Sequence, residues 1–306
     1  MTRVLRVATR GSRLALRQVE IIGELLGLNV EPVIIRTLGD RMGAVPLRAI
    51  AGQGAFAAEV REALVAGAAD IAVHSAKDLP PRPDSRLELA AFPERGDPRD
   101  VLVGATLADV PIGGTVASGA PRRRAQLAAL RPDLTFAELR GNIDTRLAKA
   151  SQYSAVVVAA AALQRLGIVP DAPAQVFDVA EFVPQVGQGA LAIEARSDDT
   201  RCLRLLATVD HSPTREAVTA ERAFLAELGG DCDLPAGAHA TITPEGAQIH
   251  AVLLGPDGIL RHSLAISADP ASAGVAAARD LWSQLSPGSA NPADRSARPV
   301  LQAGAA

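Results

Sequence analysis

Four side chains that can take part in chemistry lie within five positions, directly after a short apolar run at residues 71–73. They are His74, Ser75, Lys77 and Asp78. The apolar run predicts a buried strand, and ligands bind just beyond the carboxyl ends of strands in open α/β sheets. We therefore expect Asp78 to be a working carboxylate, with Lys77 beside it to keep it ionised or to meet an anion. The alternative is an aspartate that caps a turn among solvated neighbours.

Three further junctions between a predicted strand and a predicted helix carry arginine, at residues 9–12, 118–124 and 140–146. Free backbone N–H groups and the helix dipole favour an anion at the start of a helix. Guanidinium groups add forked donors that suit carboxylate or phosphate. Any one of these arginines could equally be solvated helix surface. Their repetition at three junctions favours an anion-binding site.

The elements that must position these groups alternate between strands and helices. In the first unit the patterns predict strands at 5–9, 33–37 and 71–73 and helices at 12–26 and 57–66. After the turn-rich stretch 93–100 the alternation restarts, with strands at 101–103, 115–117, 134–139 and 155–159 and helices at 121–130 and 143–150. We expect two related α/β domains facing a cleft, with the glycine-rich crossing 183–190 and a strand at 191–195 returning to the first domain.

A third unit follows. A helix at 212–228, strands at 238–243, 247–254 and 260–267, and a helix at 271–285 predict a small α+β domain with a three-stranded antiparallel sheet. The tail is rich in Ser, Ala, Pro and Gly and has little to bury. The expected domains are residues 1–95 with 189–210, residues 96–188 and residues 211–290, with 291–306 as a disordered tail.

The composition favours a globular protein and argues against a nucleic-acid-binding or membrane-spanning one. A chain of 306 residues with 48% hydrophobic content and a net charge of −3 is globular and gives no reason to expect nucleic acid. The charge is uneven, since residues 118–146 hold six arginines and three acidic residues. The longest apolar run, residues 155–163, is too short to span a membrane, and the basic start of the chain breaks before a secretory core forms. We expect a cytoplasmic protein.

The two cysteines, Cys202 and Cys232, exclude a disulfide framework. Cys202 shares a helical face with Leu205, Leu206 and Val209, which predicts a place in the core. Cys232 lies in a loop of Gly and Asp where a helix ends, without any apolar periodicity to bury it. The second cysteine is therefore the one available for chemistry.

Taken together, the motifs resemble the porphobilinogen deaminase family, also called hydroxymethylbilane synthases. The resemblance covers nearly the whole chain. It depends on the order of several short motifs: Ala8–Ser12, Asp70–Asp78, Asp97–Asp100, Leu139–Asn142 with Thr145 and Arg146, Val186–Gly189, and Val218–Arg222 leading to Gly230–Cys232. It implies three domains, of which the first two are similar to type II periplasmic binding proteins and the third carries the cysteine.

The resemblance also implies the chemistry. Cys232 would hold a dipyrromethane cofactor through a thioether, and four porphobilinogens would be added to it in turn, each losing ammonia, before water releases the linear tetrapyrrole. Asp78 would stabilise the pyrrole N–H and move protons. The residues implied for the cofactor are Lys77, Ser118, Arg122, Arg123 and Arg146. Those implied for the incoming porphobilinogen are Arg10, Ser12, Ser75, Arg140, Asn142, Arg165 and Gln188.

The expected partners are few. The resemblance implies a monomer that takes porphobilinogen as a small-molecule substrate, with no metal, nucleic acid or membrane. This chain has Ala117–Ala120 where the family usually has Gly-Thr-Ser-Ser, and Gln53 where a lysine often stands. Two alternatives are an inactive or weakened paralogue and a two-lobed binding protein for a small polycarboxylate. Retention of Asp78 and Cys232 counts against loss of function, and the lack of a secretory core counts against a periplasmic receptor.

Overall fold

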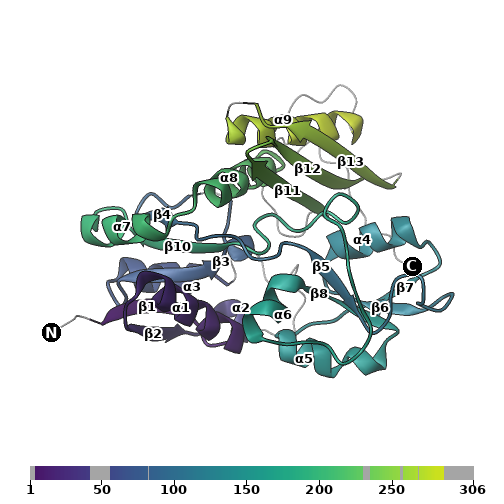
Figure 1. Ribbon diagram of the computed structural model, residues 1–306, viewed down its shortest axis with the longest axis horizontal. Coiled ribbons are helices and arrows are strands. Elements are labelled where there is room, and N and C mark those ends of the chain that lie inside the picture. The colour runs from purple at the N-terminus through teal and green to yellow at the C-terminus, as the bar shows by residue number, and fades with distance from the viewer. Residues whose placement is uncertain are drawn as a thin grey trace.

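The strands of the chain form three separate sheets (Figure 1). The computed structural model describes residues 4–41, 56–81, 83–229, 235–255, 258–267 and 269–285. In these ranges two sheets have five strands each and the third has three. Cys232, Gln53 and the tail 291–306, for which predictions were made above, lie outside the described residues.

The first sheet has the strand order β2-β1-β3-β10-β4. Its strands are β1 (Leu5–Arg10), β2 (Val30–Ile35), β3 (Ile71–Ser75), β4 (Leu87–Ala91) and β10 (Leu191–Arg196). Strands β2 and β3 run parallel to β1, whereas β10 runs antiparallel to β3 and β4. The helical elements of this lobe are α1 (Arg13–Leu26), α2 (Leu38–Arg41), α3 (Ala58–Val65), the 3-10 turn η2 (Ala76–Asp78), α7 (Thr200–Leu206) and η4 (Ala207–Val209).

The second sheet repeats this arrangement with the order β7-β6-β8-β5-β9. Its strands are β5 (Asp100–Val103), β6 (Thr115–Ala117), β7 (Thr135–Ala137), β8 (Ala155–Ala159) and β9 (Ala174–Val176). Strands β7 and β8 run parallel to β6, and β5 runs antiparallel to β8 and β9. The helices are α4 (Pro121–Leu130), α5 (Ile143–Ala148), the 3-10 turn η3 (Ala150–Gln152) and α6 (Ala160–Leu166).

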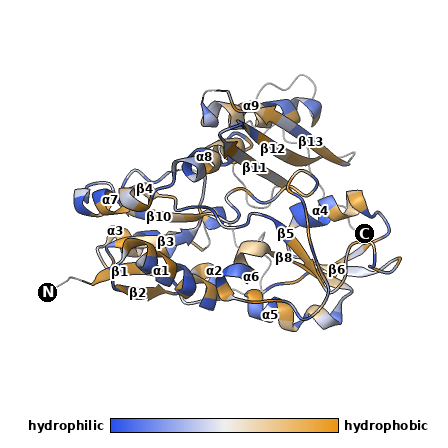
Figure 2. Ribbon diagram, in the orientation of Figure 1, coloured by the Kyte–Doolittle hydropathy of each residue, from blue (hydrophilic) through white to orange (hydrophobic). Residues whose placement is uncertain are grey.

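Each five-stranded sheet thus holds one antiparallel strand beside a crossing between the lobes: β5 follows the first crossing and β10 the second. This is the double crossover expected of type II periplasmic-binding-protein-like lobes, and the predicted fold class is confirmed. Figure 2 shows apolar residues along the inner strands β5 and β8 and polar residues at the start of α4, where the arginines lie.

The third sheet is antiparallel, with β11 (Ala236–Thr243), β12 (Gly246–Gly255) and β13 (Gly258–Ala265) in sequence order. Helices α8 (Ser212–Glu227) and α9 (Pro270–Leu285) pack against each other. Together with the third sheet they form a core in which Phe224 and Trp282 are buried. Gly274 permits this contact, because a Cβ there would come within 2.0 Å of the Ala220 carbonyl oxygen. The small α+β domain is therefore confirmed, while the exact domain boundaries stay a prediction.

Several local predictions were wrong. Strand β2 begins at Val30, three residues before the predicted start, because this edge strand carries Pro32 and exposed residues that hide its alternation. Strand β3 continues through Ser75, so that His74 lies inside the strand. The patterns missed β4, β9 and α6; the last follows β8 without a break, so that the two elements form one apolar run. Within the described ranges, no helix combines the length and apolar character needed to cross a bilayer.

Candidate active site

The turn η2 carries Asp78 directly after the buried strand β3. Two contacts with the second crossing hold this turn: the Ala76 N–H donates to the Ala190 carbonyl at 3.0 Å, and Gln185 Nε2 donates to the Lys77 carbonyl at 3.4 Å. Gly187 allows the close approach, since a Cβ there would lie 2.9 Å from the backbone of Ala76 and Lys77. The crossing between the lobes therefore positions Asp78.

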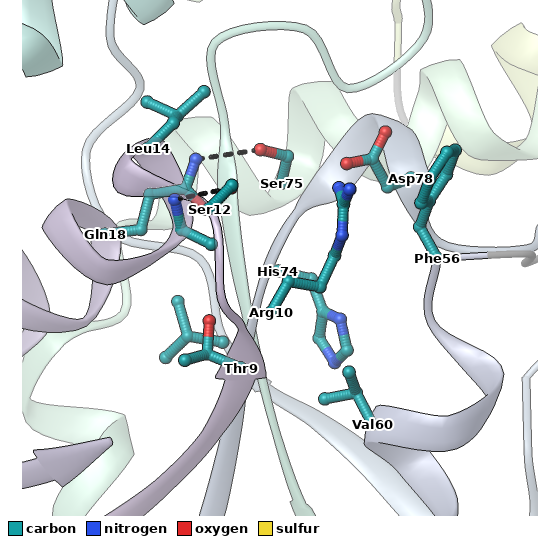
Figure 3. Close-up of a pocket in the computed structure, with 12 residues that line it drawn as sticks. Thr9, Arg10, Ser12, Leu14, Gln18, Phe56, Val60, His74, Ser75 and Asp78 are labelled. Atoms are coloured by element: carbon teal, nitrogen blue, oxygen red, sulfur yellow. Dashed lines mark hydrogen bonds between the residues drawn. The ribbon is translucent and has the colours of Figure 1, made fainter. Parts of the chain in front are cut away.

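A pocket opens beside this turn in the first lobe (Figure 3). Its lining comes from the end of β1, the first turns of α1, the segment from Phe56 into α3, the end of β3 and the turn η2: Thr9, Arg10, Ser12, Leu14, Ala15, Gln18, Phe56, Val60, Val73, His74, Ser75 and Asp78. Ser12 caps α1 by accepting a hydrogen bond from the Ala15 N–H at 3.2 Å. Gln18 donates to Ser75 Oγ at 2.9 Å. Four predicted site residues, Arg10, Ser12, Ser75 and Asp78, thus meet in one pocket.

Arg10 is held at the rim of this pocket by two contacts. Its Nε donates to Asp40 Oδ1 at 3.1 Å, and its guanidinium lies 4.2 Å from the centre of the Phe56 ring. Burial alone would raise the pKa of Asp40, but hydrogen bonds from Arg10 and Thr37 lower it. Arg10 is thereby presented as a fixed cation, which suits an anionic substrate group.

No side chain or backbone group that the structure describes hydrogen-bonds or ion-pairs with the Asp78 carboxylate. Its electrostatic neighbours are Lys77 and Arg146, from the first and second lobes. A carboxylate that lines a pocket close to two cations, with no partner among the described residues, is available to a ligand.

Lys77 and Arg146 are both short of counter-charge. The pKa of Lys77 is lowered to about 8, mainly by burial and in smaller part by Arg123 and Arg146, while Asp78 and Asp100 act in the opposite sense. Burial also lowers the pKa of Arg146 to about 10, with a further contribution from Arg123. Arg146 Nε donates to the Gly141 carbonyl at 2.9 Å. Both side chains are half-buried, and half-buried cations with few anions beside them suit a ligand that brings several carboxylates.

Arg122 and Arg123 start α4 in the second lobe, as expected, and both are buried. They are already paired within the protein, because Arg122 Nη2 and Arg123 Nη2 each lie 2.7 Å from the carboxylate of Asp100. Ser118 is also buried, and its Oγ accepts from the Ala120 N–H at 3.3 Å. In this part of the predicted site the charged side chains are already paired with one another, and we call such an arrangement a closed network.

The remaining predicted residues are more dispersed. Arg140 pairs with Glu138 at 2.9 Å, and Asn142 caps α5 by accepting from the Thr145 N–H at 2.9 Å. Arg165 donates to the Gly189 carbonyl at 2.6 Å, and burial lowers its pKa to about 10. Gln188 is buried and donates to Asp100 at 2.8 Å. Asn142 is thus engaged as a helix cap.

The described cysteine, Cys202, lies in the core of the first lobe. Burial raises the pKa of its thiol to about 11, and Asp199 adds to the shift. A thiol that is buried and protonated is a poor nucleophile. The prediction that Cys202 is a core residue is confirmed.

Residue patterns missed several members of the site. Gln18 and Phe56 line the pocket. In the sequence analysis Gln18 was only a residue of a predicted helix, and Phe56 only the end of a predicted loop. Glu194 lies on β10 and binds Arg61 at 2.6 Å and His74 at 3.1 Å beneath the pocket. A charged residue inside an otherwise apolar strand was the available signal for Glu194.

Comparison with known proteins now identifies the family. A family model described as "Porphobilinogen deaminase, dipyromethane cofactor binding domain" matches residues 5–204, and one described as "Porphobilinogen deaminase, C-terminal domain" matches residues 215–282. The chain belongs to the porphobilinogen deaminase family. The family resemblance inferred from the motifs is confirmed.

Relatives support this assignment over most of the chain. A porphobilinogen deaminase of Acidothermus cellulolyticus is 47% identical, and the alignment covers 88% of this chain and 85% of the relative. One from Roseiflexus sp. is 44% identical over 93% of this chain and 97% of the relative. A solved structure described as a probable amino-acid ABC transporter extracellular-binding protein of Bacillus subtilis has a TM-score of 0.38 at 10% identity, and the match covers 68% of this chain and 91% of that protein. As a member of the porphobilinogen deaminase family, the chain is a transferase of tetrapyrrole synthesis.

The residues of this structure fit the cofactor that the family implies. Dipyrromethane carries acetate and propionate groups, and Lys77 and Arg146 are half-buried cations in a cluster that holds more positive than negative side chains. The buried Gln188 Oε1 has no hydrogen-bond partner among the described residues. Within the same ranges, no group of His, Cys, Asp and Glu is arranged to bind a metal.

Proposed function

We propose that this chain acts as a hydroxymethylbilane synthase that joins four porphobilinogens head to tail, with Asp78 as its catalytic carboxylate and Cys232 as the point of cofactor attachment. The observation that carries the proposal is the Asp78 carboxylate, which lines the pocket without a partner among the described residues and lies in the field of Lys77 and Arg146. The proposal includes a cytoplasmic monomer with the three domains outlined above.

In this proposal the dipyrromethane supplies, when bound, the pyrrole position to which substrate is joined. Lys77 and Arg146 would hold its carboxylates. The residues of the first lobe act on porphobilinogen. Arg10 and Ser12 bind a substrate carboxylate at the start of α1, where the helix dipole adds to the attraction.

Asp78 has two tasks in this scheme. Its carboxylate accepts a hydrogen bond from the pyrrole N–H, and its negative charge stabilises the positive charge that develops on the substrate as ammonia leaves. Both tasks require a carboxylate oxygen that is not already engaged, and no described residue hydrogen-bonds or ion-pairs with the Asp78 carboxylate. Asp100, which is bound by three side chains, is unsuited to this role.

The two cysteines provide a matched test of the attachment site. Intact-mass measurement of purified wild-type protein and of Cys202→Ala should show a two-pyrrole adduct, whereas Cys232→Ser should show the bare chain. Ammonia release from added porphobilinogen should follow the adduct. An adduct on Cys232→Ser would overturn the attachment. A wild-type chain of bare mass that gains nothing from porphobilinogen would overturn the function.

A further inference from the structure

Asp100 is a fully buried carboxylate at the start of β5, where the chain enters the second lobe. Its Oδ2 accepts from Arg122 Nη2 at 2.7 Å. Its Oδ1 accepts from Arg123 Nη2 at 2.7 Å and Nε at 3.2 Å, and from Gln188 Nε2 at 2.8 Å. Three side chains from two distant parts of the chain therefore converge on one carboxylate.

The side chains that donate to Asp100 also donate to backbone carbonyl groups. Arg122 Nη1 donates to the Val183 carbonyl, and Arg123 Nη1 donates to the Val157 carbonyl at 3.0 Å. Gln188 Nε2 also donates to the Pro98 carbonyl at 2.8 Å. The guanidinium groups are thus fixed in direction by acceptors on several sides.

The charges around Asp100 do not balance. Five cations, Lys77, Arg122, Arg123, Arg140 and Arg146, interact with three anions, Asp78, Asp100 and Glu138. Arg123 lies close enough to both Lys77 and Arg146 to oppose their protonation. Removing the charge of Asp100 would leave the five cations with Asp78 and Glu138, and the buried Arg122 and Arg123 would lose their direct counter-ion, which is costly inside a protein.

We propose that Asp100 is a positioning residue that serves as the internal counter-ion of the cofactor site: it assembles Arg122, Arg123 and Gln188 before the cofactor is present and shares their charge with the cofactor's carboxylates afterwards. This inference rests on the proposed function, because it takes the cationic cluster to be the cofactor's binding site. It predicts that cofactor and Asp100 partly replace each other as sources of negative charge.

The test compares the melting temperature of wild type and Asp100→Asn, each prepared with the cofactor and without it. Cofactor-free protein is obtained by expression in a host that makes no porphobilinogen, and loading is verified by intact mass. The loss of melting temperature caused by the substitution should be at least about twice as large without the cofactor as with it. Equal losses in the two forms would reduce Asp100 to an ordinary structural residue and overturn the proposal.

A second variant keeps the test decisive if Asp100→Asn does not fold. The double variant Asp100→Asn/Arg122→Gln removes one anion and one cation, so the cofactor-free protein should regain most of the lost melting temperature, or become soluble where the single variant is not. Its cofactor occupancy by intact mass should nevertheless fall below that of wild type. A double variant no more stable or soluble than the single one would contradict charge compensation.

Asp97→Asn is the matched control. Asp97 lies in the same crossing segment and pairs with Arg99 at 2.6 Å, but the Asp97 and Arg99 side chains are 26% and 46% exposed. Its substitution should change the melting temperature little and equally in both forms. Failure of the proposed function would be recognised separately, because wild-type protein would then carry no adduct at all.

Discussion

In the first lobe the Asp78 carboxylate follows β3 and has no hydrogen-bond partner among the described residues, whereas in the second lobe Asp100 starts β5 and is bound by Arg122, Arg123 and Gln188. Both aspartates lie in the same cationic cluster, since Lys77 is influenced by each of them. The two lobes also share one strand order. The topology therefore supplies two comparable carboxylates, and their immediate neighbours decide which one can act on substrate.

Whether a carboxylate is open or bound depends on its neighbouring residues and not on the lobe in which it lies. The first lobe contains a closed carboxylate of its own, Glu194 on β10, which binds Arg61 at 2.6 Å and His74 at 3.1 Å. Burial alone would raise the pKa of Glu194, but His74 and Arg61 lower it. A carboxylate held in this way supports the sheet beneath the pocket and has no free oxygen for chemistry.

The largest effect is expected from the open carboxylate. Asp78→Asn retains the shape of the side chain but removes the charge that stabilises the substrate, so kcat should fall by about 10²- to 10⁴-fold. The melting temperature should fall less than in Asp100→Asn, because the Asp78 carboxylate contributes its charge to the cluster but has no described hydrogen-bond partner to lose. Product formation and thermal unfolding, measured on the same preparation, check both statements.

Asp84→Asn is the control for this change. Asp84 lies six residues further on and pairs with Arg86 at 2.7 Å away from the pocket, so its loss should leave kcat unchanged. Near-normal turnover by Asp78→Asn would show that the open carboxylate is not the catalytic one.

The next effect concerns the closed carboxylate of the first lobe. Glu194→Gln leaves Arg61 buried without its counter-ion and should lower the free energy of unfolding by about 3 kcal/mol. Because the folded-state pKa of Glu194 lies below its usual value of 4.5, its contribution is present above pH 4.5 and is lost as the pH falls below it. Urea unfolding at pH 7 and at pH 3 should therefore show a smaller difference between wild type and variant at the lower pH. A difference of similar size at both would contradict this account.

Much of this architecture could be predicted from residue patterns. The helix α1 was predictable because Ser12 and Gly27 mark its two ends and its apolar residues share one face. Asp78 was predictable as a candidate because polar residues follow a buried strand ahead of two prolines. Local rules were sufficient at these places, since the decisive contacts lie within a few residues.

The closed networks were beyond such rules. Asp100 was placed in a turn-rich crossing and in a short family motif, but no role was predicted for it, because its partners lie 22 to 88 positions away along the chain. Arg122 and Arg123 were expected to face a ligand, yet they meet Asp100 first. Which buried cation has a partner depends on how the lobes pack, and that information is not local in the sequence.

The smallest predicted effect is a shift in the pKa of Lys77. This lysine interacts electrostatically with both Asp78 and Asp100. Burial lowers its pKa to about 8 in the protein without cofactor, so between about pH 8 and 10.5 the unfolded chain keeps a proton that the folded chain has released, and stability rises with pH. Carboxylates of a bound cofactor favour the ammonium form. Loading should therefore raise this pKa by about one unit or more.

Lys149 makes this measurable, because it is the only other lysine in the chain and is exposed. Acetylation of each amine by acetic anhydride, followed by peptide mass spectrometry over a pH series, reports the two pKa values in one sample. The Lys77 curve should shift to higher pH on loading while the Lys149 curve stays in place. If both curves stay in place, Lys77 does not meet the cofactor's carboxylates, and the excess positive charge around Asp78 and Asp100 must have another use.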